Sequence, residues 1–216
     1  MSKKNARWRK LDNAAKLYSA ASNKKDTRVF RFYCELKEEV DSDVLQEALN
    51  QTIETFPTFL MVLRKGFFWH YLEPCNLRPI VKEEYKEPCS RLYIRDKKTL
   101  LFEVTYYKKR INFEVFHVLT DGTGATEFLK ELVKNYLYFA HKEEGLEQVA
   151  LLPEDMTVQD QEDDSFLKYY SKDQKRPKKR KLNAFQIRRK KKDGNHLHVH
   201  ESVVSVQAVL KRSREL

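Results

Sequence analysis

Hydrophobic and polar positions along this chain follow two different periods. Strand-forming residues in rough alternation predict a strand over Arg28–Leu36. Apolar positions three or four apart then predict a helix from Asp41 to Phe56, because a short polar residue can accept hydrogen bonds from the free N–H groups at its start and Pro57 ends it. A second apolar stripe, between Phe128 and Ala140, predicts a longer helix that begins near Gly124.

Two pairs of strands are predicted as hairpins. The first joins 59–63 to 67–72 around Arg64-Lys65-Gly66, and the second joins 100–107 to 111–117 over Lys108-Lys109-Arg110. Further elements are predicted at 79–81, 92–94, 165–170, 184–187, 197–203 (with a turn at Asp193-Gly194) and in a C-terminal helix from Val206. Hairpins combined with two substantial helices predict an α+β fold or a layered α/β sandwich.

Composition narrows the class of protein. A chain of 216 residues with 41% hydrophobic and 12% aromatic residues is long and apolar enough for one folded domain or a tight pair of lobes. Only five glycines argue against a glycine-rich nucleotide fold. No apolar run reaches the roughly 18 residues of a membrane helix, and the basic start lacks the apolar stretch of a signal peptide. Cys34, Cys75 and Cys89 form no CxxC pair and read as reduced thiols of a cytoplasmic protein.

The net charge of +10 is local. Lys172–Lys192 holds twelve Lys and Arg and one acid, which leaves the rest of the chain near −1, and Glu143–Asp164 holds nine acids and no Lys or Arg. We therefore predict a single lobe over 1–216 that carries a mobile acidic and basic insertion at 143–192. Binding of nucleic acid through the basic segment is an alternative, but no nucleic-acid-binding motif surrounds it, which disfavours this role.

The candidate chemistry lies in Phe116-His117-Val-Leu-Thr-Asp121-Gly122. A histidine at the end of a buried strand, next to a turn with glycine, is held rigidly, and an imidazole suits general-base work because its unperturbed pKa is near 6.5. Asp121 can fold back beneath the loop and fix its geometry. Gly122 and Gly124 allow backbone angles that other residues resist.

This HxxxDG pattern resembles the signature of the chloramphenicol acetyltransferase-like superfamily, which includes peptide-synthetase condensation domains and alcohol acetyltransferases. A strand before the motif and an amphipathic helix after it fit that family. Other stretches are similar to bacterial alcohol-acetyltransferase-like proteins, so that the resemblance runs over most of 6–216; they are 8–16, 28–40, 43–57 and 66–72.

The resemblance implies a two-layer α/β sandwich of the chloramphenicol acetyltransferase type, with a mostly antiparallel mixed sheet and helices on one face. It implies an acyltransferase in which His117 deprotonates a small alcohol or amine acceptor, which attacks an acyl thioester. Acetyl-CoA or another acyl-CoA is then the cosubstrate, with no tightly bound cofactor and no metal. Asp121 and Gly122 would support the site without touching substrate.

Two features of the resemblance leave alternatives open. Related condensation domains pair this aspartate with an arginine; Arg64 and Arg31 are the candidates here, and neither is assigned. Two-lobed members place their tunnel between lobes, so this chain resembles an N-terminal lobe that works with a C-terminal lobe or as a homo-oligomer. A non-catalytic half-enzyme or interaction module of the same fold is therefore the alternative function.

Two other clusters of residues each allow a functional interpretation and a structural one. His196, His198 and His200 alternate along a predicted strand and share one face, where they suit zinc or nickel, although such spacing is common by chance. Trp69 with its aromatic neighbours suits an acyl pocket, although alternating aromatics in a hairpin more often belong to a core.

Overall fold

A computed structural model of the chain describes residues 8–67, 69–95, 97–144 and 202–215. The chain divides into two compact units, Met1–Gln174 and Lys175–Leu216. In the first unit the elements are β1 (Arg9–Lys10), α1 (Asn13–Ala21), β2 (Val29–Glu35), α2 (Ser42–Thr55), η1 (Pro57–Phe59), β3 (Met61–Lys65), β4 (His70–Pro74), β5 (Lys82–Glu83), β6 (Phe102–Tyr107), β7 (Arg110–Phe116), α3 (Gly122–Ala140) and η2 (Lys142–Glu144).

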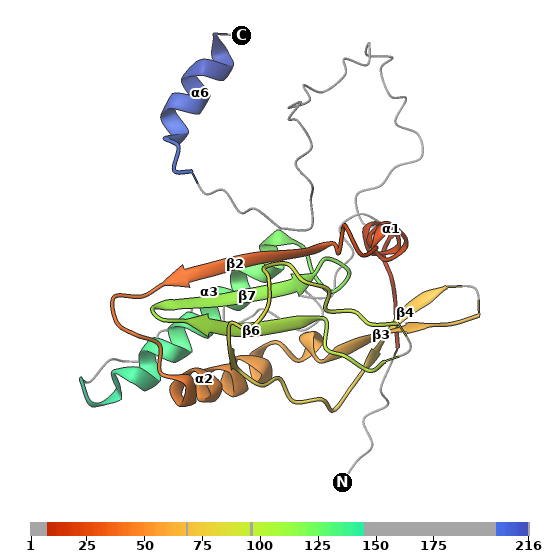
Figure 1. The fold of residues 1–216 in the computed structure, drawn as a ribbon, viewed down its shortest axis with the longest axis horizontal. Helices are drawn as coiled ribbons and strands as arrows, with labels where there is room; N and C mark the ends of the chain where they lie inside the picture. The colour runs from red at the N-terminus through yellow and green to blue at the C-terminus, as the bar shows by residue number, and fades with distance from the viewer. Residues whose placement is uncertain (1–7, 68, 96, 145–201, 216) are drawn as a thin grey trace. The chain divides into compact units, whose positions relative to one another are not determined.

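The main sheet has four strands in the order β2-β7-β6-β5. The β2–β7 and β6–β7 pairs are antiparallel, and the short β5 runs parallel to β6. Helices α2 and α3 pack against each other and lie behind the strands in Figure 1, where they cover one face of the sheet. This arrangement confirms the predicted two-layer fold class, with a mostly antiparallel sheet and helices on one face.

The apolar core between the helices and the sheet follows the alternation of β7. Ile111, Phe113 and Val115 project to the helix side and are fully buried, where they meet Phe128 and Leu132 of α3. Burial of a Phe or Leu side chain contributes roughly 1.5–3 kcal/mol, so this face accounts for much of the stability of the fold. The periodicity of the sequence identified these same positions.

A second apolar cluster lies at the end of β7 from which the chain leaves toward α3. It joins Phe116 and Val118 to Leu11 and Ala15 at the start of α1. It also includes Leu72 of β4, which belongs to a separate three-stranded sheet of order β1-β4-β3. The second cluster therefore fixes α1 beside the end of β7 (Figure 1).

Several boundaries and elements differ from the sequence-based expectation. The turn of the β3–β4 hairpin lies over Gly66–Trp69, not at 64–66, because Gly66 N donates to Trp69 O at 2.7 Å. The strand predicted at 79–81 is shifted to β5, and 92–94 forms no strand. Neither β1 nor α1 was expected.

The second unit is described only over residues 202–215. Helix α6 (Val206–Arg214) confirms the predicted C-terminal helix, whereas Ser202 and Val203 are not part of a strand. The predicted elements at 165–170 and 184–187, the Asp193-Gly194 turn, the histidines at 196, 198 and 200, and most of the insertion at 143–192 lie outside the described residues. No helix in the described part of the chain has the length and apolarity that crossing a bilayer requires.

Candidate active site

His117 is the first residue after β7, and the backbone on both sides holds it in place. Its N–H donates to the carbonyl oxygen of Arg28 at 2.9 Å, which extends the β2–β7 ladder by one bond. The preceding Phe116 is buried, and its N–H donates to Leu101 O at 2.8 Å. Arg28 itself has a φ of 56°, in the left-handed region that a non-glycine residue adopts at a cost. The backbone is thus strained at Arg28, the residue whose carbonyl accepts the hydrogen bond from His117.

Aromatic rings enclose the imidazole of His117. The ring of Tyr18 stacks on it, with centroids 4.0 Å apart and planes at 16°, and the ring of Phe30 lies at 4.8 Å and 57°. The side chain is half-buried, and its Nδ1 is buried with no hydrogen-bond partner among the described residues. Packing against Tyr18 and Phe30 therefore orients the ring.

Tyr18 reaches His117 because of the way α1 begins. The carboxylate of Asp12 caps the helix by accepting from Ala15 N at 2.6 Å, and Leu11 and Ala15 are buried in the second cluster. Leu11, Ala15 and Tyr18 recur at helical spacing, so one face of α1 is anchored while Tyr18 covers His117. The sequence reasoning missed Tyr18, although the Asp12 cap and this spacing were the signals that could have found it.

Asp121 and the glycines that follow it act on the helix that leads away from His117. Asp121 is the N-cap of α3, where its carboxylate accepts from Gly124 N at 2.9 Å and its carbonyl from Ala125 N at 3.0 Å. Such a cap stabilises a helix by about 1 kcal/mol. Neither Gly122 nor Gly124 has a φ in the left-handed region that glycine allows. An added Cβ at Gly124 would clash with Thr120 Oγ1, so a larger residue there requires the Thr120 side chain to move.

Neither candidate arginine is paired with Asp121. Arg31 donates to Glu114 at 2.9 Å and to Glu84 at 2.6 Å, and Arg64 pairs with Glu73 at 3.0 Å. Among the residues that the structure describes, Asp121 has no ion pair. Its observed role is the capping of α3, immediately after the His117 turn.

A second histidine, His70 of β4, also contacts α1. Its Nδ1 lies 3.1 Å from Ser19 Oγ, on the residue after Tyr18. Burial and the positive charges of Lys65 and Arg95 lower the pKa of His70 below its ordinary value. Nothing local in the sequence connects His70 with the region of His117, because 47 positions separate them along the chain.

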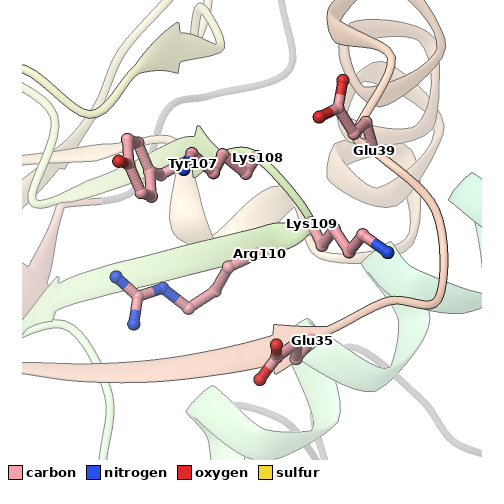
Figure 2. A pocket seen from close by; sticks show the side chains of 6 residues that line it. All are labelled: Glu35, Glu39, Tyr107, Lys108, Lys109 and Arg110. Carbon is pink, nitrogen blue, oxygen red and sulfur yellow. The ribbon is translucent and has the colours of Figure 1, made fainter.

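The opposite end of β7 carries a hollow of about 320 Å³ at the β6–β7 turn. Figure 2 shows that Tyr107 and Arg110 point to one side of this turn and Lys109 to the other. Lys109 Nζ donates to the Lys37 carbonyl at 2.7 Å, and Glu35 and Glu39 offset the positive charges of the turn. This hollow does not include His117 and is separated from it by the length of β7.

The structure leaves the predicted ligands untested. Within the described residues no three or more His, Cys, Asp or Glu side chains are grouped as a metal site requires. Two of the aromatic residues considered for an acyl pocket are exposed at the β3–β4 hairpin, Phe67 at 93% and Trp69 at 58%.

Comparison with known proteins identifies solved structures that have a similar fold. Neither models of protein families nor curated proteins give a match. Among solved structures, the chain is similar to the starter condensation domain of rhizomide synthetase RzmA, with a TM-score of 0.52 and 12% identity over 67% of this chain and 40% of that one. A mutant of that domain in complex with C8-CoA gives 0.52 and 13% over 66% and 38%. The first condensation domain of the CDA synthetase gives 0.50 and 15% over 67% and 42%.

The matched region is shorter than those domains, since this chain spans less than half of their length. At this level of identity the likeness concerns the fold alone. The fold of the superfamily expected from the HxxxDG pattern is thereby confirmed: the chain has a condensation-domain-like fold.

Proposed function

We propose that this chain is the histidine-bearing lobe of an acyltransferase, with His117 as the general base. The observation that carries the proposal is the imidazole itself. It lies at the end of a central strand, stacked against Tyr18, with Nδ1 buried, so Nε2 is the nitrogen that we assign to the reaction. Aromatic packing against Tyr18 and Phe30 supports a fixed orientation, which general-base catalysis requires.

The proposed reaction moves one acyl group and one proton. Nε2 takes the proton of an alcohol or amine while the acceptor oxygen or nitrogen attacks the thioester carbonyl. The tetrahedral intermediate then breaks its C–S bond, and the leaving thiolate takes the proton back from the imidazolium, which gives an ester or amide and a free thiol. Asp121 supports this step through the α3 cap and does not contact the reactants.

Acyl-CoA is the donor that we propose. The support is by analogy, because a mutant of a domain with a similar fold is in complex with C8-CoA. Acetyl-CoA or a longer acyl-CoA is therefore the first donor to test, together with a panel of small alcohols and amines.

The test is release of free CoA thiol by the full chain with and without an acceptor. His117→Ala is expected to lower the rate by about 100-fold or more, because a positioned general base contributes roughly that factor. His70→Ala is the matched control, since it removes the other histidine in contact with α1 and should change the rate little. Thermal unfolding of both variants confirms that they fold. Full activity in His117→Ala would show that another group is the base.

A half-enzyme that acts only with a second lobe is the alternative of the same fold. The observation that favours it is the match to only 40% of the length of the RzmA domain. In that case the isolated chain releases no thiol, yet a complementary lobe added in trans restores a rate that depends on His117.

A further inference from the structure

A basic groove runs along the edge of the main sheet where β5 borders β6. Its volume is about 360 Å³, in the lower part of the range for small-molecule sites. Its walls come from residues within 77–80, 82–86, 91–94 and 98–100, and from Phe102 to Val104 of β6. Segments apart in sequence thus converge on one hollow.

The charge of the groove is strongly unbalanced. Among the residues that the structure describes, five cations line it against one carboxylate, Glu103; they are Arg78, Lys82, Lys86, Arg91 and Lys98. Glu103 already pairs with Lys82 at 3.6 Å and with Lys86. The other three cations are exposed and have no acidic partner within the described part of the chain.

These cations suit phosphate better than an isolated carboxylate. A guanidinium presents parallel N–H donors that match phosphate oxygens, and an ammonium adds a compact positive charge. Arg78, Arg91 and Lys98 all line the same hollow, and a ligand with two linked phosphate groups supplies acceptor oxygens for all three.

An aromatic ring beside the cations narrows the ligand class further. Tyr85 is 60% exposed, and its hydroxyl donates to Glu103 at 2.9 Å, which fixes the ring. Lys82 and Lys86 Nζ lie 5.2 and 5.3 Å from the ring centroid. Ile80 and Ile94 line the same groove and are also exposed. A purely inorganic anion would leave this aromatic and apolar surface without a contact.

We propose that the groove binds the nucleoside diphosphate part of a small ligand. Arg78, Arg91 and Lys98 contact the phosphates, and Tyr85 packs against the base. The groove lies toward the His117 end of the sheet, because Phe102 pairs with Val115, two residues before His117. A free nucleotide and coenzyme A share this diphosphate chemistry. Only the coenzyme A source rests on the proposed acyl transfer.

The test is isothermal titration calorimetry of the full chain with ADP, coenzyme A, adenosine and inorganic pyrophosphate. ADP should bind, with an affinity that decreases as salt increases. The double variant Arg78→Ala/Arg91→Ala should bind ADP at least about tenfold more weakly, since a charge-assisted hydrogen bond contributes about that factor. Tyr85→Leu should weaken ADP and coenzyme A but leave pyrophosphate unchanged.

A matched control separates the groove from the general basicity of the chain. Lys24→Ala/Lys25→Ala also removes two exposed positive charges, from the loop before β2, and should change ADP affinity less than about twofold. Equal losses in the two double variants, or no binding of ADP at millimolar concentration, would overturn the proposal.

The comparison of coenzyme A with ADP shows whether the natural ligand is the coenzyme or a free nucleotide. Coenzyme A binding about tenfold tighter than ADP identifies the coenzyme, whereas equal affinities identify a free nucleotide, and both support the groove. His117→Ala should bind either ligand as the wild type does. Loss of nucleotide binding in the groove variants and loss of thiol release in His117→Ala are therefore measured separately, so one proposal can be wrong without the other.

Discussion

The two faces of the four-stranded sheet are stabilised in different ways. On the helix side, Phe113 of β7 packs among aromatic rings, with Phe128 at 4.6 Å and Phe102 at 6.1 Å between centroids. On the other side, Arg31 donates to Glu114, which is 1% exposed, and Glu103 lies opposite Glu114 across the β6–β7 pair. The first face depends on area removed from water, and the second on each charge having its partner.

This difference shows how the second face is kept neutral. Two carboxylates directly opposite each other repel, but Arg31 neutralises Glu114 and Lys86 neutralises Glu103. Glu114 also accepts from Cys89 N at 2.6 Å. The charged face therefore anchors the segment from Glu84 to Cys89, which borders the proposed nucleotide groove.

Truncation on the apolar face should have the largest effect on stability. Phe113→Ala should lower the free energy of unfolding by about 4 kcal/mol, because it removes a fully buried ring and leaves a cavity. Urea unfolding followed by circular dichroism measures this. Leu17→Ala is the control, because Leu17 of α1 is 66% exposed, and the expected change is below about 0.5 kcal/mol. Similar losses in both variants would contradict the position of the core.

The two faces also differ in how far the sequence predicts them. The helix side was predictable because period-two and helical spacing mark Phe113 and Phe128 as buried wherever their partners lie. The pairing of Arg31 with Glu114 was not predictable, because 83 positions separate them and nothing local links one charge to another. In the same way His117 was found from its local motif, whereas its contact with Tyr18 depends on tertiary packing of α1.

Breaking one buried pair on the charged face should have the next largest effect. Arg31→Met should lower the free energy of unfolding by about 3 kcal/mol, because it leaves Glu114 charged and buried without a cation. Adding Glu114→Leu should recover at least half of that loss, since it removes the unpaired charge. A double-mutant cycle in urea measures the coupling. A loss in the double variant as large as the two single losses combined would show that the pair is not coupled.

The smallest expected effect on the free energy of unfolding comes from Lys86, and it depends on pH. Burial by itself lowers the pKa of Lys86, but the hydrogen bond and charge of Glu103 outweigh it, so that the pKa is raised above its usual value. The folded state then holds this proton more tightly than the unfolded state. Its contribution to stability is complete below about pH 10.4, the ordinary pKa of lysine, and is lost as the pH rises through the folded pKa.

Urea unfolding of the wild type and Lys86→Met at pH 8, 10 and 11 tests this contribution. The wild type should be the more stable at pH 8, and the difference should narrow at pH 11, whereas an exposed control, Lys24→Met, should differ little from the wild type at any of the three. A difference that stays constant with pH would mean that Lys86 stabilises the fold by packing of its aliphatic stem. The ion pair between Lys86 and Glu103 would then contribute little to stability, and the charged face would differ from the apolar face less than its geometry indicates.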